Sequence, residues 1–193
     1  MSGQEEQIKN NNTKNQDNQV RYVQIRVMDI ANGEGIGCAI YFQGCPYHCY
    51  NCFNPETWDL SPSAGKAFTK EQEDFILTLI ESRHLKRITF LGGEPLIERN
   101  LATLNRMVKA IKAKRPDMKI WFFSGNTYEK LMEDKGVVEI LKLSDILVDG
   151  PFIDKQKNFR LKFRGSENQR IIDLKKTFEE GRVILREDLM ECR

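Results

Sequence analysis

Short apolar segments that end in glycine-rich or serine-rich turns constrain the fold of this chain more than any other feature. Four such segments occur, at residues 38–42, 86–91, 119–123 and 146–150. Apolar strands that alternate with helices form parallel sheets whose faces the helices cover. A closed eight-stranded barrel of this kind needs about 250 residues. With 193 residues, the pattern predicts an α/β fold with a mostly parallel sheet that does not close into such a barrel.

Three stretches between these segments have the apolar spacing of helices. The first begins with Thr69 and Gln72, the two side chains of a capping box, and its apolar stripe extends to about Arg83. The second stops before Pro116, because proline disfavours a helical residue before it. The third covers residues 128–143. These helices supply the cover that a parallel sheet requires.

The N-terminal residues differ in composition from the rest of the chain. Residues 1–19 contain one isoleucine, no aromatic residue and many asparagines and glutamines, which predicts a disordered polar tail. Order is predicted to begin with a strand of β-branched residues at 20–27. The remaining residues, 20–193, are enough for a single domain with its own core but not for two domains.

Charge and hydropathy exclude several classes of protein. Thirty basic side chains against twenty-eight acidic ones leave a formal charge of +2, which disfavours a protein built to coat nucleic acid. No run of about 18 apolar residues, such as a membrane-spanning helix needs, is present. We therefore expect a cytoplasmic protein that binds neither nucleic acid nor membranes.

A cysteine loop directly follows the segment 38–42, at a strand end where α/β proteins build their sites. Cys45, Cys49 and Cys52 supply three thiolates with the spacing C-x3-C-x2-C. A 4Fe–4S cluster held by three cysteines has one iron without a protein ligand, and that iron is open to a substrate or cofactor. Ferredoxins differ, since a fourth cysteine completes their ligation. Here the next cysteine after Cys52 is Cys192.

Two other interpretations of this loop remain open. Zinc prefers four ligands, and Cys38 or His48 is available as a fourth, although structural zinc sites normally use two separated ligand pairs. Disulfides are disfavoured because the five cysteines are odd in number and no apolar signal segment is present. We interpret Cys38, which lies within a predicted strand, as a small buried residue.

The turns that end the other strands add glycines and polar groups. Gly92, Gly93 and Glu94 follow one strand, Ser124 follows the next, and Asp149 ends the last. The carboxyl ends of parallel strands meet at one edge of a sheet, so these turns are expected to line one rim with the cysteine loop. Backbone at the two glycines can approach a ligand closely, and the Glu94 carboxylate can face an ammonium group. An ordinary turn before a helix is the alternative.

These motifs resemble those of the radical S-adenosylmethionine family, whose members bind a 4Fe–4S cluster through C-x3-C-x2-C. More narrowly, residues 20–182 resemble the activating proteins of the anaerobic, glycyl-radical ribonucleoside-triphosphate reductase. The segments that carry this resemblance are residues 43–45, 54–58, 145–152 and 161–170. Two alternatives remain: a radical S-adenosylmethionine enzyme acting on a small molecule, such as a deazaguanine-forming synthase, and a noncatalytic zinc or electron-transfer module.

The resemblance implies an incomplete β/α barrel in which Cys45, Cys49 and Cys52 ligate three irons of the cluster. The amino and carboxylate groups of S-adenosylmethionine would bind the fourth iron. The residues assigned to this cofactor are Asn51, Cys52, Phe53, Gly92, Gly93, Glu94 and Ser124. Most relatives have an aromatic residue where this chain has Asn51, so the adenine contacts depart from the family pattern.

The resemblance further implies the reaction. The reduced cluster passes one electron to S-adenosylmethionine, whose carbon–sulfur bond breaks to give methionine and a 5′-deoxyadenosyl radical. That radical removes a hydrogen from one glycine of the reductase, which is the protein substrate. As a second partner we expect a reducing electron donor such as a flavodoxin. No side chain is predicted to act as a catalytic acid, base or nucleophile.

A basic segment follows the last predicted strand. Residues 154–170 carry six basic and two acidic side chains, and Arg160, Lys162 and Arg164 alternate with apolar residues. The alternation predicts a strand with a basic face. Docking of the reductase and a simple solvated face are both compatible with this charge.

Overall fold

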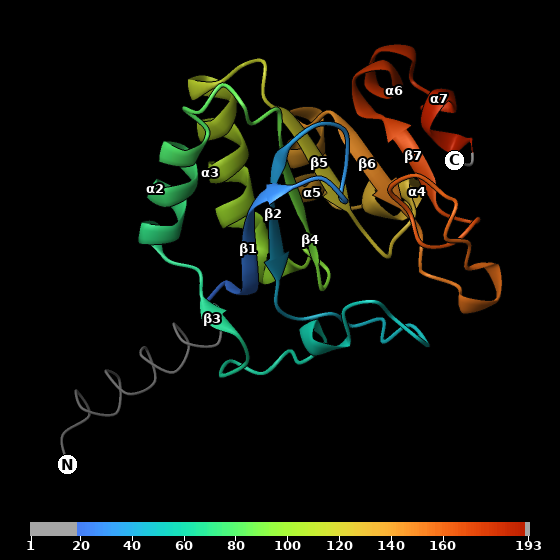
Figure 1. The fold of residues 1–193 in the computed structure, drawn as a ribbon, viewed down its shortest axis with the longest axis horizontal. Helices are drawn as coiled ribbons and strands as arrows, with labels where there is room; N and C mark the ends of the chain where they lie inside the picture. Colours follow the sequence, from blue (N-terminus) through green and yellow to red (C-terminus); the bar gives the residue numbers. More distant parts are fainter. Residues whose placement is uncertain (1–18, 192–193) are drawn as a thin grey trace.

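The computed structural model describes residues 19–191, which form a seven-stranded sheet with the order β3-β1-β2-β4-β5-β6-β7 (Figure 1). The strands are β1 (Arg21–Asp29), β2 (Gly37–Phe42), β3 (Lys66–Ala67), β4 (Arg87–Gly92), β5 (Lys119–Phe123), β6 (Ile146–Asp149) and β7 (Arg170–Asp173). The helices are α2 (Lys70–Leu79), α3 (Glu98–Lys114), α4 (Tyr128–Leu131), α5 (Lys135–Lys142), α6 (Leu174–Glu180) and α7 (Glu187–Met190), with 3-10 helices η1 (Pro55–Thr57) and η2 (Asp154–Gln156). The predicted tail, except for Gln19, lies outside the described residues.

The sheet is mixed rather than mostly parallel. The four predicted apolar segments are β2, β4, β5 and β6, and they pair with one another in parallel. β1, β3 and β7 add three antiparallel pairings at the two sides. In the described part of the chain, the edge strands β3 and β7 do not pair with each other, so the sheet is not closed. The α/β class is therefore as predicted, whereas the antiparallel edges were not predicted.

Alternate residues of the central strands face opposite sides of the sheet. The side chains on one face, among them Ile40, Phe90 and Phe122, pack against the apolar sides of α2, α3 and α5 and form the main core. Each fully buried side chain of this size contributes about 1.5–3 kcal/mol, so this face supplies much of the stabilisation. Tyr41 and Phe123 lie on the opposite face of the sheet, where they line a cavity.

The predicted helices are present with one correction. Thr69 and Gln72 form the expected capping box at the start of α2. The helix predicted over residues 128–143 is two helices, α4 and α5. Asp134 separates them because its carboxylate accepts hydrogen bonds from the first backbone N–H groups of α5. Among the described residues, none of the helices is long and apolar enough to cross a membrane.

The prediction of a basic strand within residues 154–170 is wrong. This segment consists of η2, turns and isolated bridges before β7 begins. Turn chemistry overrides the alternation of residue types: the side chain of Asn158 accepts a hydrogen bond from the N–H of Arg160 at 3.0 Å. Phe163 has φ of 53°, which is incompatible with a strand.

The loop between β1 and β2 is anchored to the sheet by a buried ion pair. The guanidinium of Arg87, in β4, is fully buried and contacts the Asp29 carboxylate at 2.7 Å. Asp29 also accepts hydrogen bonds from the backbone and side-chain N–H groups of Asn32, at 2.9 and 2.8 Å. Asn32 in turn donates to the Tyr41 hydroxyl at 3.0 Å. This network holds the loop against the face of the sheet that carries the cavity.

Candidate functional site

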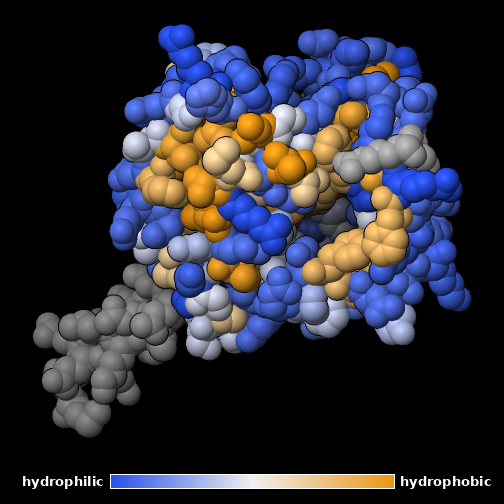
Figure 2. All heavy atoms as spheres, viewed as in Figure 1, coloured by the Kyte–Doolittle hydropathy of each residue, from blue (hydrophilic) through white to orange (hydrophobic). Residues whose placement is uncertain are grey.

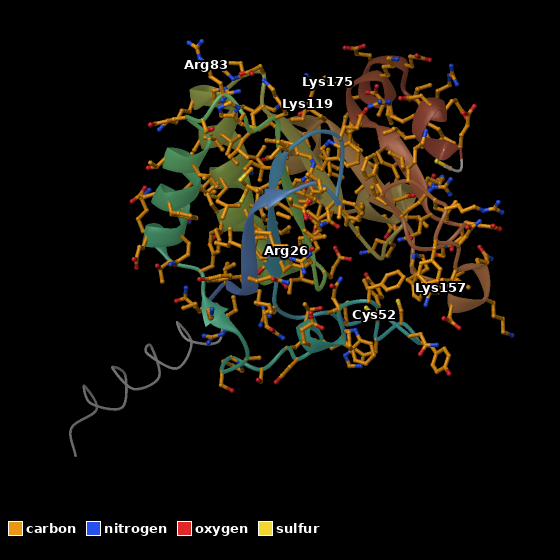
Figure 3. All side chains as sticks on the ribbon, in the orientation of Figure 1. Arg26, Cys52, Arg83, Lys119, Lys157 and Lys175 are labelled. Atoms are coloured by element: carbon orange, nitrogen blue, oxygen red, sulfur yellow. The ribbon has the colours of Figure 1, made fainter. Side chains whose placement is uncertain are left out.

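A cavity of about 600 Å³ lies at the carboxyl ends of β2, β4 and β5, and Figure 2 shows a hollow on this face of the molecule. Cys52 lies at this edge of the sheet, whereas Lys119, which begins β5, lies at the opposite edge (Figure 3). Eight of the nine predicted site residues line the cavity: Cys45, Cys49, Cys52, Phe53, Gly92, Gly93, Glu94 and Ser124. The turns that follow these strands therefore meet around one cavity, as expected from the sequence.

The cysteine loop is fixed at its base by the segment that contains η1. The backbone N–H of Gly44 donates to the carbonyl of Thr57 at 2.7 Å. Higher in the loop, the ring of His48 stacks on Trp58 with the centroids 4.9 Å apart. His48 is exposed and has φ of 45°. These contacts place His48 in the support of the loop and tie the loop to the segment around η1.

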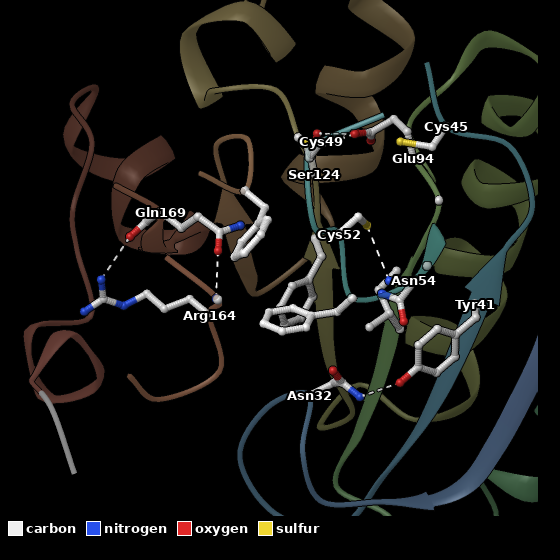
Figure 4. A pocket seen from close by; sticks show the side chains of 18 of the residues that line it. Asn32, Tyr41, Cys45, Cys49, Cys52, Asn54, Glu94, Ser124, Arg164 and Gln169 are labelled. Carbon is white, nitrogen blue, oxygen red and sulfur yellow. Dashed lines mark hydrogen bonds between the residues drawn. The ribbon is translucent and has the colours of Figure 1, made fainter. Parts of the chain in front are cut away.

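The three loop thiols are free, half-buried and in contact with the cavity. Burial raises the pKa of the Cys45 thiol, against backbone hydrogen bonds that lower it. Cys52 Sγ accepts a hydrogen bond from the Asn54 N–H at 3.4 Å (Figure 4). Within residues 19–191, no three His, Cys, Asp or Glu side chains are arranged to hold a single metal ion. A cubane cluster does not require that arrangement, because each thiolate binds a different iron.

Close backbone packing accounts for both glycines of the turn after β4. Gly92 has φ of 109°, and a Cβ at this position would lie 2.7 Å from the backbone nitrogen of Phe42. A Cβ at Gly93 would lie 2.3 Å from the carbonyl oxygen of Gly44. The N–H groups of Gly93 and Glu94 donate to the carbonyls of Phe42 and Gly44, at 2.9 and 2.8 Å. These two N–H groups therefore bond to the protein's own backbone, and a ligand in the cavity cannot use them as hydrogen-bond donors.

Gly93→Ala is expected to displace the base of the cysteine loop, because the atoms that the new methyl group meets are backbone and cannot rotate away. Overpacking of this kind costs about 1–3 kcal/mol. Iron bound per chain after anaerobic reconstitution should fall. Gly136→Ala is the matched control, since its nearest neighbours are side-chain atoms of Asp134 and Leu101. Equal iron content in the two variants would contradict this account of the turn.

Glu94 joins the ends of β4 and β5 from inside the protein. Its side chain is buried, and its carboxylate accepts a hydrogen bond from Ser124 Oγ at 3.0 Å (Figure 4). The carboxylate also accepts hydrogen bonds from the Gly125 N–H at 2.8 Å and the Leu96 N–H at 3.1 Å. Burial raises the pKa of Glu94 to about 7, although these hydrogen bonds lower it. A cationic group beside this carboxylate would favour its ionised form.

Asn51 and Phe53 flank Cys52 but take different positions. Asn51 has φ of 55°, a conformation that asparagine adopts more readily than most residues. Its side chain is exposed and donates to Asp154 Oδ1 at 3.2 Å, outside the cavity lining. Phe53 lines the cavity and packs on Phe152 with the ring centroids 5.0 Å apart. Phe53, rather than Asn51, therefore borders the cavity.

The cavity also contains residues that the sequence did not single out, among them Tyr41, Tyr47, Phe152 and Gln169. Tyr47 packs on Gly125, where a Cβ would lie 2.6 Å from its ring, and burial raises the pKa of Tyr47 to about 12. Gln169 donates to the Gly150 carbonyl at 3.1 Å and accepts from the Gly165 N–H at 2.8 Å. Strand alternation would have placed Tyr41 on the cavity face, whereas the other three depend on tertiary contacts.

Comparison with known proteins defines the class of this site. Residues 31–172 match a family model described as a 4Fe-4S single cluster domain, and this range includes the cysteine loop and every cavity residue named above. The chain is thus similar to proteins that carry a single 4Fe–4S cluster.

Curated relatives narrow the class. The anaerobic ribonucleoside-triphosphate reductase-activating proteins of Pasteurella multocida and Vibrio cholerae are 38% and 36% identical to this chain over 152 residues. Each match covers 78% of this chain, and 95% and 96% of the respective relative. The counterpart from Enterobacteria phage T4 is 29% identical over 154 residues, or 79% of this chain and 93% of its own length. The chain therefore belongs to the family of anaerobic ribonucleoside-triphosphate reductase-activating proteins.

Proposed function

We propose that the protein is an activase that cleaves S-adenosylmethionine reductively and uses the 5′-deoxyadenosyl radical to generate a glycyl radical on an anaerobic ribonucleoside-triphosphate reductase. The main observation in support of this proposal is that one cavity is lined by the three loop cysteines, Phe53, Glu94 and Ser124. The relatives are named as activating proteins of this reductase, which supports the reductase as the partner and favours a protein substrate over a small molecule.

The residues present fit a 4Fe–4S cluster with one open iron. Cys45, Cys49 and Cys52 line the cavity. Cys38 is fully buried in the main core, on the other side of the sheet. Among the described cysteines, three thiolates are therefore available to the cavity. When bound there, the cluster supplies an electron at low potential and a coordination position for S-adenosylmethionine.

S-adenosylmethionine is proposed to occupy the remainder of the cavity. A volume of about 600 Å³ is within the range of ligand pockets. The buried Glu94 carboxylate favours a cation nearby, as the methionine ammonium would be. Phe53 offers an apolar ring for the adenine, and Ser124 holds Glu94 in place at 3.0 Å. We infer an incomplete β/α barrel of the radical S-adenosylmethionine type, because the cavity lies at the carboxyl ends of parallel strands.

We also propose a low-potential electron donor such as a flavodoxin and a cytoplasmic site of action. No side chain of the cavity is assigned as a catalytic acid, base or nucleophile. The protein's part is to hold the thiolates, orient the cofactor and exclude water from it.

The test is glycyl-radical formation on the reductase. Anaerobically reconstituted protein, dithionite, S-adenosylmethionine and the reductase are expected to give the doublet electron paramagnetic resonance signal of a glycyl radical, with methionine and 5′-deoxyadenosine as products. Omitting S-adenosylmethionine should remove the signal. Cofactor cleavage that leaves no radical on the reductase, or that depends on a small-molecule substrate instead, would overturn the proposal.

A further inference from the structure

A second segment lies beside the cysteine loop at the mouth of the cavity. Figure 1 shows the segment around η2 next to this loop, and Figure 3 shows Lys157 on the same side of the molecule as Cys52. Two contacts join them: the hydrogen bond from Asn51 to Asp154, and Lys157 Nζ, which lies 5.2 Å from the centroid of the Phe53 ring. The loop and this segment therefore form one continuous rim.

The rim exposes aromatic rings to an unusual degree. Phe159 is 82% exposed, Tyr50 is 77% exposed and Phe53 is 53% exposed. Lys157 Nζ also lies 4.8 Å from the Phe159 centroid, so one ammonium group contacts two rings. Burying a phenylalanine side chain is favourable, and aromatic side chains gathered at one exposed site are typical of binding surfaces.

The segment of the rim that contains η2 is strongly basic. Six basic and two acidic side chains give residues 154–170 a formal charge of +4, whereas the whole chain carries +2. The remainder of the chain is therefore net acidic. Lys155, Lys157 and Arg160 are exposed, and no acidic side chain among residues 19–191 forms an ion pair with them.

The other basic residues of this segment have structural partners. Arg170 pairs with Asp149 and Glu129. Lys162 donates to the carbonyl of Asp188 at 2.9 Å, and Arg164 donates to that of Gln169 at 3.3 Å. The exposed basic surface therefore consists of Lys155, Lys157 and Arg160 around Phe159. It differs from the face predicted from the sequence, which combined Arg160 with Lys162 and Arg164.

The geometry points to this rim, made of Tyr50, Phe53, Lys155, Lys157, Phe159 and Arg160, as the surface that docks an acidic segment of the partner protein bearing an apolar anchor side chain. This inference rests on the proposed function, which requires part of a protein to reach the cavity. Charge complementarity selects acidic side chains on the partner. The exposed ring of Phe159 selects an apolar anchor. Phe53 belongs to the rim and also lines the cavity, so the docked segment would lie at the cavity mouth.

Two variants test the docking surface: Phe159→Ala and the double variant Lys155→Glu, Arg160→Glu. None of these residues lines the cavity, so dithionite-driven cleavage of S-adenosylmethionine without the reductase should be unchanged. The reductase concentration that half-saturates glycyl-radical formation should rise about 30-fold for Phe159→Ala, as for an interface hot spot. It should also rise in the double variant. Added salt should raise it in the wild type and have less effect in the double variant.

Matched controls are available on the helices. Phe75 in α2 is 48% exposed, and Phe75→Ala removes the same side chain from a distant surface. Lys109→Glu with Lys142→Glu changes the net charge by the same amount, at exposed positions of α3 and α5. Both controls should have the half-saturating reductase concentration of the wild type.

The outcomes separate the two proposals. If the wild type forms the glycyl radical and the rim variants have its half-saturating concentration, the docking inference fails and the proposed function stands. If the wild type cleaves S-adenosylmethionine but forms no glycyl radical, the proposed function itself fails. Sedimentation that shows a dimer of this chain dissociating on Phe159→Ala would assign the surface to a second copy and overturn the inference.

Discussion

Replacing any one of Cys45, Cys49 and Cys52 by alanine is expected to abolish cleavage of S-adenosylmethionine. Each thiolate of the loop is proposed to bind a different iron, so the loss of one leaves two protein ligands for the cluster. Iron content after anaerobic reconstitution should fall well below the value of about four per chain that a complete cluster gives. Formation of 5′-deoxyadenosine should be lost with it.

Cys38→Ala is the matched control for this experiment. Cys38 is fully buried in β2, and burial raises the pKa of its thiol to about 12. Because the side chain packs in the main core rather than in the cavity, the variant should retain the cluster and the cleavage reaction. Cleavage that survives Cys49→Ala would contradict the proposed mechanism. An equal loss in Cys38→Ala would show that the assay reports general destabilisation instead.

Among the substitutions considered for this protein, Asp29→Ala is expected to produce the largest loss of folding stability. It leaves the buried guanidinium of Arg87 without the carboxylate that contacts it at 2.7 Å. Removing one partner of a buried ion pair costs about 3–5 kcal/mol, which is a large part of the roughly 5–15 kcal/mol that stabilises a typical domain. Asn32 would lose two hydrogen bonds to the same carboxylate. Urea denaturation of the reduced protein measures the effect.

An exposed ion pair provides the comparison. Lys70 and Asp74 lie 2.6 Å apart with side chains 70% and 61% exposed, and Asp74→Ala should change the free energy of unfolding by less than about 1 kcal/mol. Adding Arg87→Met to Asp29→Ala should recover part of the loss, since the uncompensated charge is then gone. Equal effects of Asp29→Ala and Asp74→Ala would refute the role assigned to the buried pair.

The central strands were predictable because they are apolar on both faces. All six residues of β2 are buried, as a strand covered on both sides requires. The edge strands β3 and β7 are two and four residues long, and they exist because β1 and β6 offer backbone partners. Such short segments have no periodic signal of their own. The alternation in residues 154–170 misled because Asn158 and the positive φ of Phe163 impose turns.

The cavity was predictable in outline and not in detail. Parallel topology brings strand-ending turns to one edge, which is why the cysteine loop and the turn after β4 meet. The hydrogen bond of Glu94 with Ser124 spans 30 residues of sequence, and that of Asn51 with Asp154 spans 103. Contacts at such separations follow from the packing of loops, and no local pattern of residue types encodes them.

Electron paramagnetic resonance of the anaerobically reconstituted, dithionite-reduced protein, recorded with and without S-adenosylmethionine, tests the central claim most directly. The account predicts the spectrum of a reduced 4Fe–4S cluster that changes when S-adenosylmethionine is added, because the cofactor binds the iron that lacks a cysteine ligand. A spectrum that S-adenosylmethionine leaves unchanged, or a protein that binds no cluster, would contradict it.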